Sequence, residues 1–190
     1  PHTEAVAASG GVQVLLGAVQ DADAEVTAAG ASALEQLVGC AAGQQVIKKS
    51  GLGPCVGLLD NRDPGVQMNM LKVLTACGDD AAGQAAIVES GAAAPLVTHL
   101  DTPNPEMQKL SVDLLHSVAA DPSNRDALVK AGAAPALVSH LGADKGDTRE
   151  SALATLAAVA PLDAVNRGAP LAMPKAAIND VASFFKDDKA

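Results

Sequence analysis

The 190-residue sequence has almost no aromatic side chains: it contains two phenylalanines, Phe184 and Phe185, and no tryptophan or tyrosine. Hydrophobic residues nevertheless make up 48% of the chain, so any core must be built from alanine, valine, leucine and isoleucine. Burying a large aliphatic side chain contributes about 1.5–3 kcal/mol, so many of them must cooperate to offset the conformational entropy of the chain. A fold made of small stacked layers provides that cooperation.

Positive charge is also scarce. The chain has 13 lysines and arginines against 22 aspartates and glutamates, for a net charge of −9. The field of such a molecule repels phosphate backbones and anionic lipid. Nucleic acid is therefore not an expected partner.

Cysteine and long apolar runs are rare too. The three cysteines, Cys40, Cys55 and Cys77, form no closely spaced pair, which favours an intracellular, reducing compartment and a role as small core residues. No run of about 20 strongly apolar residues is present, so no membrane span is expected. The chain begins at Pro1 without a basic leader, as a processed or trimmed product would; the cytoplasm and the interior of an organelle both remain open.

A repeat of about 41 residues organises the chain. Its anchoring glycines are 41, 40 and 41 residues apart: Gly10, Gly51, Gly91 and Gly132. The clearest copies are the closely similar stretches Ser90–Leu100 and Ala131–Leu141. A fixed period of this length is typical of stacked helical repeats.

Each repeat predicts three helical segments. A short first helix ends at the glycine, and an apolar residue stands four positions before it: Val6, Ile47, Ile87 and Leu128. A second helix opens near a proline, which suits a first helical turn: Pro54, Pro95 and Pro135. The third segment is longest, and its apolar or small residues recur at offsets 0, 4, 5, 8 and 11, which is one face of a helix. The four copies of that face are Val26, Gly30, Ala31, Leu34 and Leu37; Val66, Met70, Leu71, Leu74 and Cys77; Met107, Ser111, Val112, Leu115 and Val118; and Thr148, Ala152, Leu153, Leu156 and Val159.

This layout, with a long third helix entered through Asn104–Leu110, resembles the armadillo repeat, and the HEAT repeat is its near neighbour. The resemblance covers Val6 to about Val159. It implies an all-α fold, a right-handed α-α superhelix of about four repeats with a degenerate C-terminal capping repeat. The implied division of this single armadillo-like solenoid, residues 1–190, is an incomplete first segment at 1–9, repeats at 10–50, 51–90, 91–131 and 132–167, and a cap and tail at 168–190.

The family is typically non-catalytic and holds a partner segment along the concave surface of its third helices. The resemblance therefore implies a scaffold or adaptor with a protein partner. The importin-alpha and beta-catenin types carry asparagine on that helix, and importin-alpha also carries tryptophan four residues earlier. The tryptophan positions correspond here to Ser32, Lys72, Asp113 and Ala154, and the asparagine positions to Gln36, Ala76, Ser117 and Ala158. Both arrays are missing, so an import-receptor role is not expected.

Polar side chains on the predicted third helices are the candidate partner contacts. They are Asn69, Lys72, Lys109, Asp113, Ser117 and Glu150. Their mixed charges suit a partner helix or a folded surface whose register is set by electrostatic complementarity. The alternative interpretation is that they are solvated surface residues.

The two ends of the chain suggest a second hypothesis for the function. His2–Ser9 aligns only with the last part of a first helix, and Phe184 and Phe185 continue an apolar stripe of a final helix that includes Ala177 and Val181. The two phenylalanines either close the end of the core or anchor a partner. These features fit a permanent structural subunit of a large multi-protein complex, in the cytoplasm or in an organelle, that contacts its neighbours through loops and ends.

No catalytic, cofactor or metal site is expected. The glycines of Gly51–Gly57 have the wrong spacing for a dinucleotide loop, and Pro54 removes a backbone donor. His99 and His140 occupy one column in adjacent repeats, about 10 Å apart, which is too far for two zinc ligands. These histidines are expected to form hydrogen bonds near the following loop.

Overall fold

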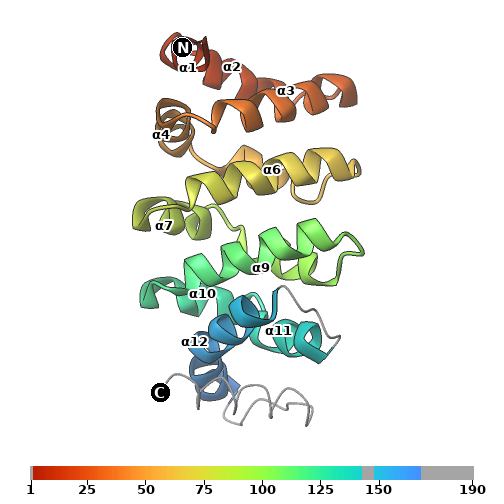
Figure 1. The fold of residues 1–190 in the computed structure, drawn as a ribbon, viewed down its shortest axis with the longest axis vertical. Coiled ribbons are helices and arrows are strands. Elements are labelled where there is room, and N and C mark those ends of the chain that lie inside the picture. The colour runs from red at the N-terminus through yellow and green to blue at the C-terminus, as the bar shows by residue number, and fades with distance from the viewer. Residues whose placement is uncertain (1, 143–147, 168–190) are drawn as a thin grey trace. The chain divides into compact units, whose positions relative to one another are not determined.

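The computed structural model describes residues 2–142 and 148–167, and every regular element in these ranges is a helix (Figure 1). The all-α class predicted from the sequence is confirmed for this part of the chain. The chain divides into two compact units, Pro1–Pro95 and Leu96–Ala190.

The first unit repeats a short, a second and a long helix in that order. The first helices are α1 (His2–Ala8), α4 (Ala41–Ser50) and α7 (Ala81–Glu89); the second helices are α2 (Gly11–Ala18) and α5 (Gly53–Gly57); the third helices are α3 (Ala24–Leu37) and α6 (Pro64–Cys77). Helices α3 and α6 lie side by side, and α4 packs against α1, α2 and α6 (Figure 1). The division between the units falls within α8 (Ala93–Thr98).

The second unit continues the same order. Its elements are η1 (His99–Asp101), α9 (Pro105–Ala119), η2 (Pro122–Asn124), α10 (Arg125–Lys130), α11 (Ala133–Gly142) and α12 (Arg149–Arg167). Helix α12 packs against α9, α10 and α11, so the third helices α9 and α12 are neighbours here as α3 and α6 are in the first unit.

The repeat period is visible in the backbone. The four anchoring glycines have φ angles of 86°, 92°, 82° and 81°, in a left-handed region that side chains with a Cβ rarely adopt. Each lies where a first helix has ended and the chain turns into the second helix. The interpretation of these glycines as repeat anchors is confirmed.

The second helices begin near the predicted prolines. Pro54 lies in the first turn of α5, and Pro95 and Pro135 are the third residues of α8 and α11. Helix α5 has only five residues because two of them are glycines, which have low helix propensity.

Polar caps fix the starts of the third helices. The side chains of Asp23, Asp63 and Asn104 accept hydrogen bonds from backbone N–H groups two residues later, at 2.8, 2.7 and 3.0 Å. A cap of this type contributes about 1 kcal/mol to helix stability. Proline occupies the next position of α6 and α9, where its missing N–H is not needed.

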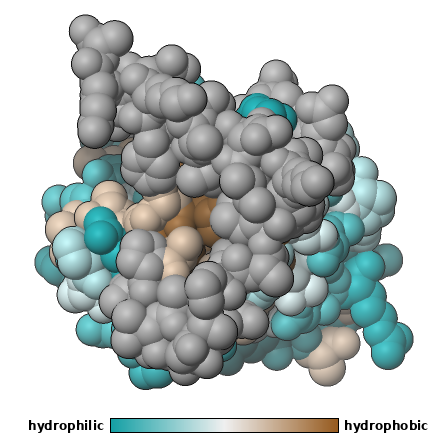
Figure 2. Space-filling view, turned by 90° about the horizontal axis from the view of Figure 1, so that it is seen from below, coloured by the Kyte–Doolittle hydropathy of each residue, from teal (hydrophilic) through white to brown (hydrophobic). Residues whose placement is uncertain are grey.

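The predicted inner face of the third helices is buried at every position except the first position of α3. Val26 is 40% exposed, whereas its counterparts Val66 and Met107 are 2% and 1% exposed. Within the first unit α3 has a third helix on one side only, which leaves this position open. Among the coloured residues in Figure 2, apolar ones lie near the centre of the view and hydrophilic ones toward the margin.

Candidate functional site

The candidate contacts lie on three of the third helices. Asn69 and Lys72 are half-buried on α6; Lys109 is exposed and Asp113 and Ser117 are half-buried on α9; Glu150 is exposed on α12. Phe184 and Phe185 lie outside the described residues.

In the second unit the structure brings two of the predicted residues together. Lys109 Nζ lies 3.1 Å from Asp113 Oδ2, one turn along α9. The hydroxyl of Ser151 on α12 donates to the other carboxylate oxygen of Asp113 at 2.9 Å. Asp113 therefore joins the two helices, while the side chains of Lys109 and Asp113 remain 52% and 36% exposed.

Ser151 is a residue that the sequence reasoning missed. It occupies the same position within its repeat as Asn69, a predicted partner contact, and it directly follows Glu150, another predicted contact. Comparing whole columns rather than single residues would have found it.

Small side chains occupy the surface beside this network. Ser117, Ala154 and Ala158 are half-buried. They occupy the positions that correspond to the asparagine and tryptophan residues of importin-alpha. The corresponding α3 residues, Ser32 and Gln36, are exposed.

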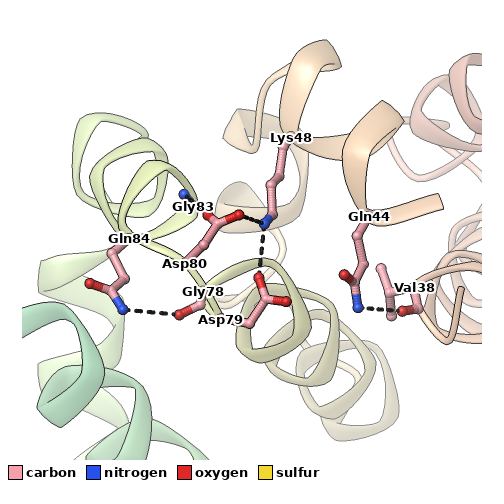
Figure 3. A network of polar contacts seen from close by, with 8 residues as sticks. All are labelled: Val38, Gln44, Lys48, Gly78, Asp79, Asp80, Gly83 and Gln84. Carbon is pink, nitrogen blue, oxygen red and sulfur yellow. Dashed lines mark hydrogen bonds and ion pairs between the residues drawn. The ribbon is translucent and has the colours of Figure 1, made fainter. Parts of the chain in front are cut away.

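A second set of polar contacts recurs where the third helix of one repeat is followed by the first helix of the next. We call each of these places a joint. Gln44 Nε2 and Gln84 Nε2 donate to the carbonyl oxygens of Val38 and Gly78 at 3.0 and 3.3 Å (Figure 3). Arg125 Nε donates in the same way to the carbonyl oxygen of Ala119 at 2.7 Å. Each carbonyl belongs to the end of a third helix, where no partner exists within the helix. The three donors are spaced by 40 and 41 residues, so the repeat period in the sequence could have indicated these contacts.

One of these joints also carries charge. Lys48 Nζ on α4 lies 2.9 Å from both Asp79 Oδ1 and Asp80 Oδ2, in the turn between α6 and α7. Burial alone would lower the pKa of Lys48, but its hydrogen bonds to the two carboxylates and their negative charges together raise it.

The cysteines behave as structural residues. Burial raises the pKa of Cys55 to about 12 and that of Cys77 to about 11, so both thiols stay protonated at neutral pH and are poor nucleophiles. Cys40 is half-buried and caps α4, where its sulfur accepts from the N–H of Gly43 at 3.4 Å. The prediction that the cysteines are core residues is confirmed for Cys55 and Cys77.

A pocket of about 440 Å³ lies between the loops that precede α3 and α6. Its lining includes Asp21, Asp60 and Asp63 and none of the predicted contact residues. The described residues contain no cluster of three or more His, Cys, Asp or Glu side chains suited to a metal ion.

One of the two histidines forms the kind of hydrogen bond expected of it. His99 and His140 are buried, and His140 Nε2 lies 2.7 Å from Oγ1 of Thr148, the residue that precedes α12. Hydrogen bonding near the loop is thus confirmed for His140. Within residues 2–142 and 148–167 no helix has the length and apolar character needed to cross a bilayer.

No family model and no curated protein sequence matches the chain. Among solved structures, a computationally designed armadillo repeat protein for modular peptide recognition matches with a TM-score of 0.77 at 20% identity, over 97% of this chain and 84% of that one. The fold is that of an armadillo-repeat protein. The resemblance read from the 41-residue period is therefore confirmed.

Two further solved structures match nearly the whole chain. A designed armadillo repeat protein in complex with the peptide (KR)4 matches with a TM-score of 0.69 at 20% identity, over 96% of this chain and 73% of that one. An engineered protein matches at 26% identity with a TM-score of 0.74, over 96% of this chain; the chain spans 43% of that structure. The armadillo fold commonly binds peptides or proteins and is typically non-catalytic.

Proposed function

We propose that this armadillo-repeat chain is a non-catalytic protein-interaction scaffold that holds a protein partner on the exposed sides of its third helices. The observation that carries the proposal is the network of Lys109, Asp113 and Ser151 on α9 and α12. It fixes a charged group in a defined position and still leaves it partly exposed. An ordered charge of this kind contributes to partner choice at a low entropic cost.

The other candidate residues complete this surface in each unit. Glu150 is exposed on α12 beside the network and adds a negative charge in the same column as Lys109. In the first unit, Asn69 on α6 offers an amide that both donates and accepts, and Lys72 lies one turn further along the same helix. We infer that these residues contact the partner and set its register.

The charge of the chain favours a partner with a positive surface. At a net charge of −9 the protein attracts cationic molecules and accelerates their association, and this effect weakens as salt is added. One designed armadillo protein of the same fold is in complex with (KR)4, a basic peptide.

The test begins with gentle purification of the native protein and mass spectrometry of the proteins that co-migrate with it. The affinity of the identified partner is then measured by calorimetry for wild type, for K109A/D113A, and for D126A/K130A. The last variant removes an exposed ion pair of the same i, i+4 spacing from α10, where Lys130 Nζ and Asp126 Oδ2 are 2.6 Å apart.

The proposal expects K109A/D113A to weaken binding by about tenfold, which corresponds to about 1.4 kcal/mol. The matched control D126A/K130A should bind as wild type does. Equal affinities for all three proteins would place the partner elsewhere and overturn the proposal.

A second candidate function is a permanent structural subunit of a larger complex. The observation that favours it is the exposure of three large apolar side chains on α1, α2 and α3, namely Val6, Val14 and Val26, at 41%, 72% and 40%. Such a subunit would co-purify at fixed stoichiometry in high salt, whereas the partner of a reversible scaffold would be substoichiometric and salt-sensitive.

A further inference from the structure

One joint carries a charged cluster that the equivalent places of the other repeats lack. The last turn of α4 carries Lys48 where α7 carries Val88 and α10 carries Val129. The turn that Lys48 faces contains Asp79 and Asp80, whereas the equivalent turns contain Gly39 with Cys40, and Ala120 with Asp121. A local departure from an otherwise consistent pattern is where function is expected.

The geometry makes Lys48 a bridge between α4 and the start of α7. Its ammonium lies 2.9 Å from a carboxylate oxygen of each aspartate, and its side chain is only 16% exposed (Figure 3). The two aspartates are 56% and 58% exposed. Most of the Lys48 side chain is therefore covered by protein, while its partners remain in contact with solvent.

The same bridge reaches into the first turn of α7. Asp80 Oδ1 accepts from the backbone N–H of Gly83 at 2.6 Å, which caps the helix, while Asp80 Oδ2 binds Lys48. Gln84, the next residue, donates to the carbonyl of Gly78. The start of α7 is thus held by a lysine of another helix acting through the capping carboxylate.

We propose that Lys48 is a charge-dependent latch that keeps the first turn of α7 closed against α4. Loss of the lysine charge releases this turn, whereas α1–α3 keep their fold. Exposed ion pairs are individually weak, so the release is a local opening and not global unfolding. The latch gives this joint a sensitivity to charge and ionic strength that the apolar counterparts Val88 and Val129 cannot provide.

The experiment is residue-resolved amide hydrogen exchange by NMR on the full chain. The variant K48Q removes the charge, K48R keeps it, and K49Q removes the charge of the neighbouring exposed lysine, for which no polar contact is described. In K48Q the amides of Gly83 and Gln84 are expected to exchange at least about threefold faster, with no change in α2 and α3. K48R and K49Q should match wild type.

Salt provides a test that requires no substitution. Raising the ionic strength from about 0.05 M to about 1 M shortens the screening length from more than about 10 Å to about 3 Å, and should accelerate exchange at Gly83 in wild type. In K48Q the same change should have no effect at that amide. Unchanged exchange at Gly83 in K48Q, or in wild type across this salt range, would overturn the latch.

Discussion

At the scale of single residues, Asp80 illustrates how one carboxylate serves two contacts. The hydrogen bond from Lys48, followed by that from the Gly83 N–H, lowers the pKa of Asp80 below its ordinary value. A group whose pKa is depressed on folding stabilises the native state above the pKa of the unfolded chain, and this stability is lost as the pH falls through the folded value. The contribution of Asp80 should therefore disappear in acid.

The variant D80N tests this dependence, because asparagine caps a helix about as well as aspartate but cannot ionise. We expect its free energy of unfolding to be lower than that of wild type at pH 7. The difference should shrink once the pH falls below about 4, where aspartates begin to protonate. Urea titrations at several pH values measure it; a difference independent of pH would contradict the assignment, and D60N, at an exposed loop position, serves as the control.

At the scale of elements, glycine decides how closely one repeat approaches the next. A Cβ built on Gly83 would overlap the carbonyl oxygen of Cys77 at the end of α6, and one on Gly43 would overlap that of Leu37 at the end of α3. At the equivalent place in the second unit stands Asn124, which is buried and donates to the carbonyl of Val118 at 3.2 Å. There the Asn124 side chain, rather than a close approach of two backbones, links the segment to the end of α9. The segment begins with the 3-10 turn η2.

The substitution G83A should therefore lower the free energy of unfolding by about 2–4 kcal/mol, because the added methyl group forces α7 away from α6. G17A is the matched control, since Gly17 lies on the exposed side of α2 and a Cβ there would meet nothing within 4 Å. It should raise stability by about 0.5–1 kcal/mol through helix propensity. Chemical denaturation monitored by circular dichroism measures both, and equal effects would refute the close-approach argument.

At the scale of the whole molecule, net charge limits the choice of partner. We expect no binding to duplex DNA at about 0.15 M salt, because phosphate contacts require a positive surface that a chain with a net charge of −9 does not provide. Fluorescence anisotropy with a labelled duplex checks this prediction. Saturable binding that weakens steeply with salt would instead reveal a local basic patch.

Much of the fold could be predicted from the sequence because it depends on local rules that repeat. The positive φ of Gly91, the caps at Asp63 and Asn104 and the buried faces of the third helices all follow from residue type and spacing. Repetition strengthened each of these signals, because the same residue types recur one period apart.

The candidate site was predictable only in part. Lys109 and Asp113 pair within one helix, at a spacing that the sequence shows, but the bond from Ser151 depends on how α12 packs against α9. Lys48 reaches two aspartates more than 30 positions away for the same reason. Contacts between helices depend on their crossing geometry, which the period alone does not specify.

The joints between repeats also bear on how such a chain changes over generations. The side-chain contact to the helix-end carbonyl at each joint, together with the close approach or the Asn124 bond beside it, lies within an eight-residue stretch: Leu37–Gln44, Cys77–Gln84 and Val118–Arg125. Loss of residues 51–90 by recombination would place Ser50 before Gly91, and the chain already contains Ser-Gly at both places. A gene built in this way can gain or lose a whole period without creating a new kind of junction, so its length can vary more easily than its local sequence.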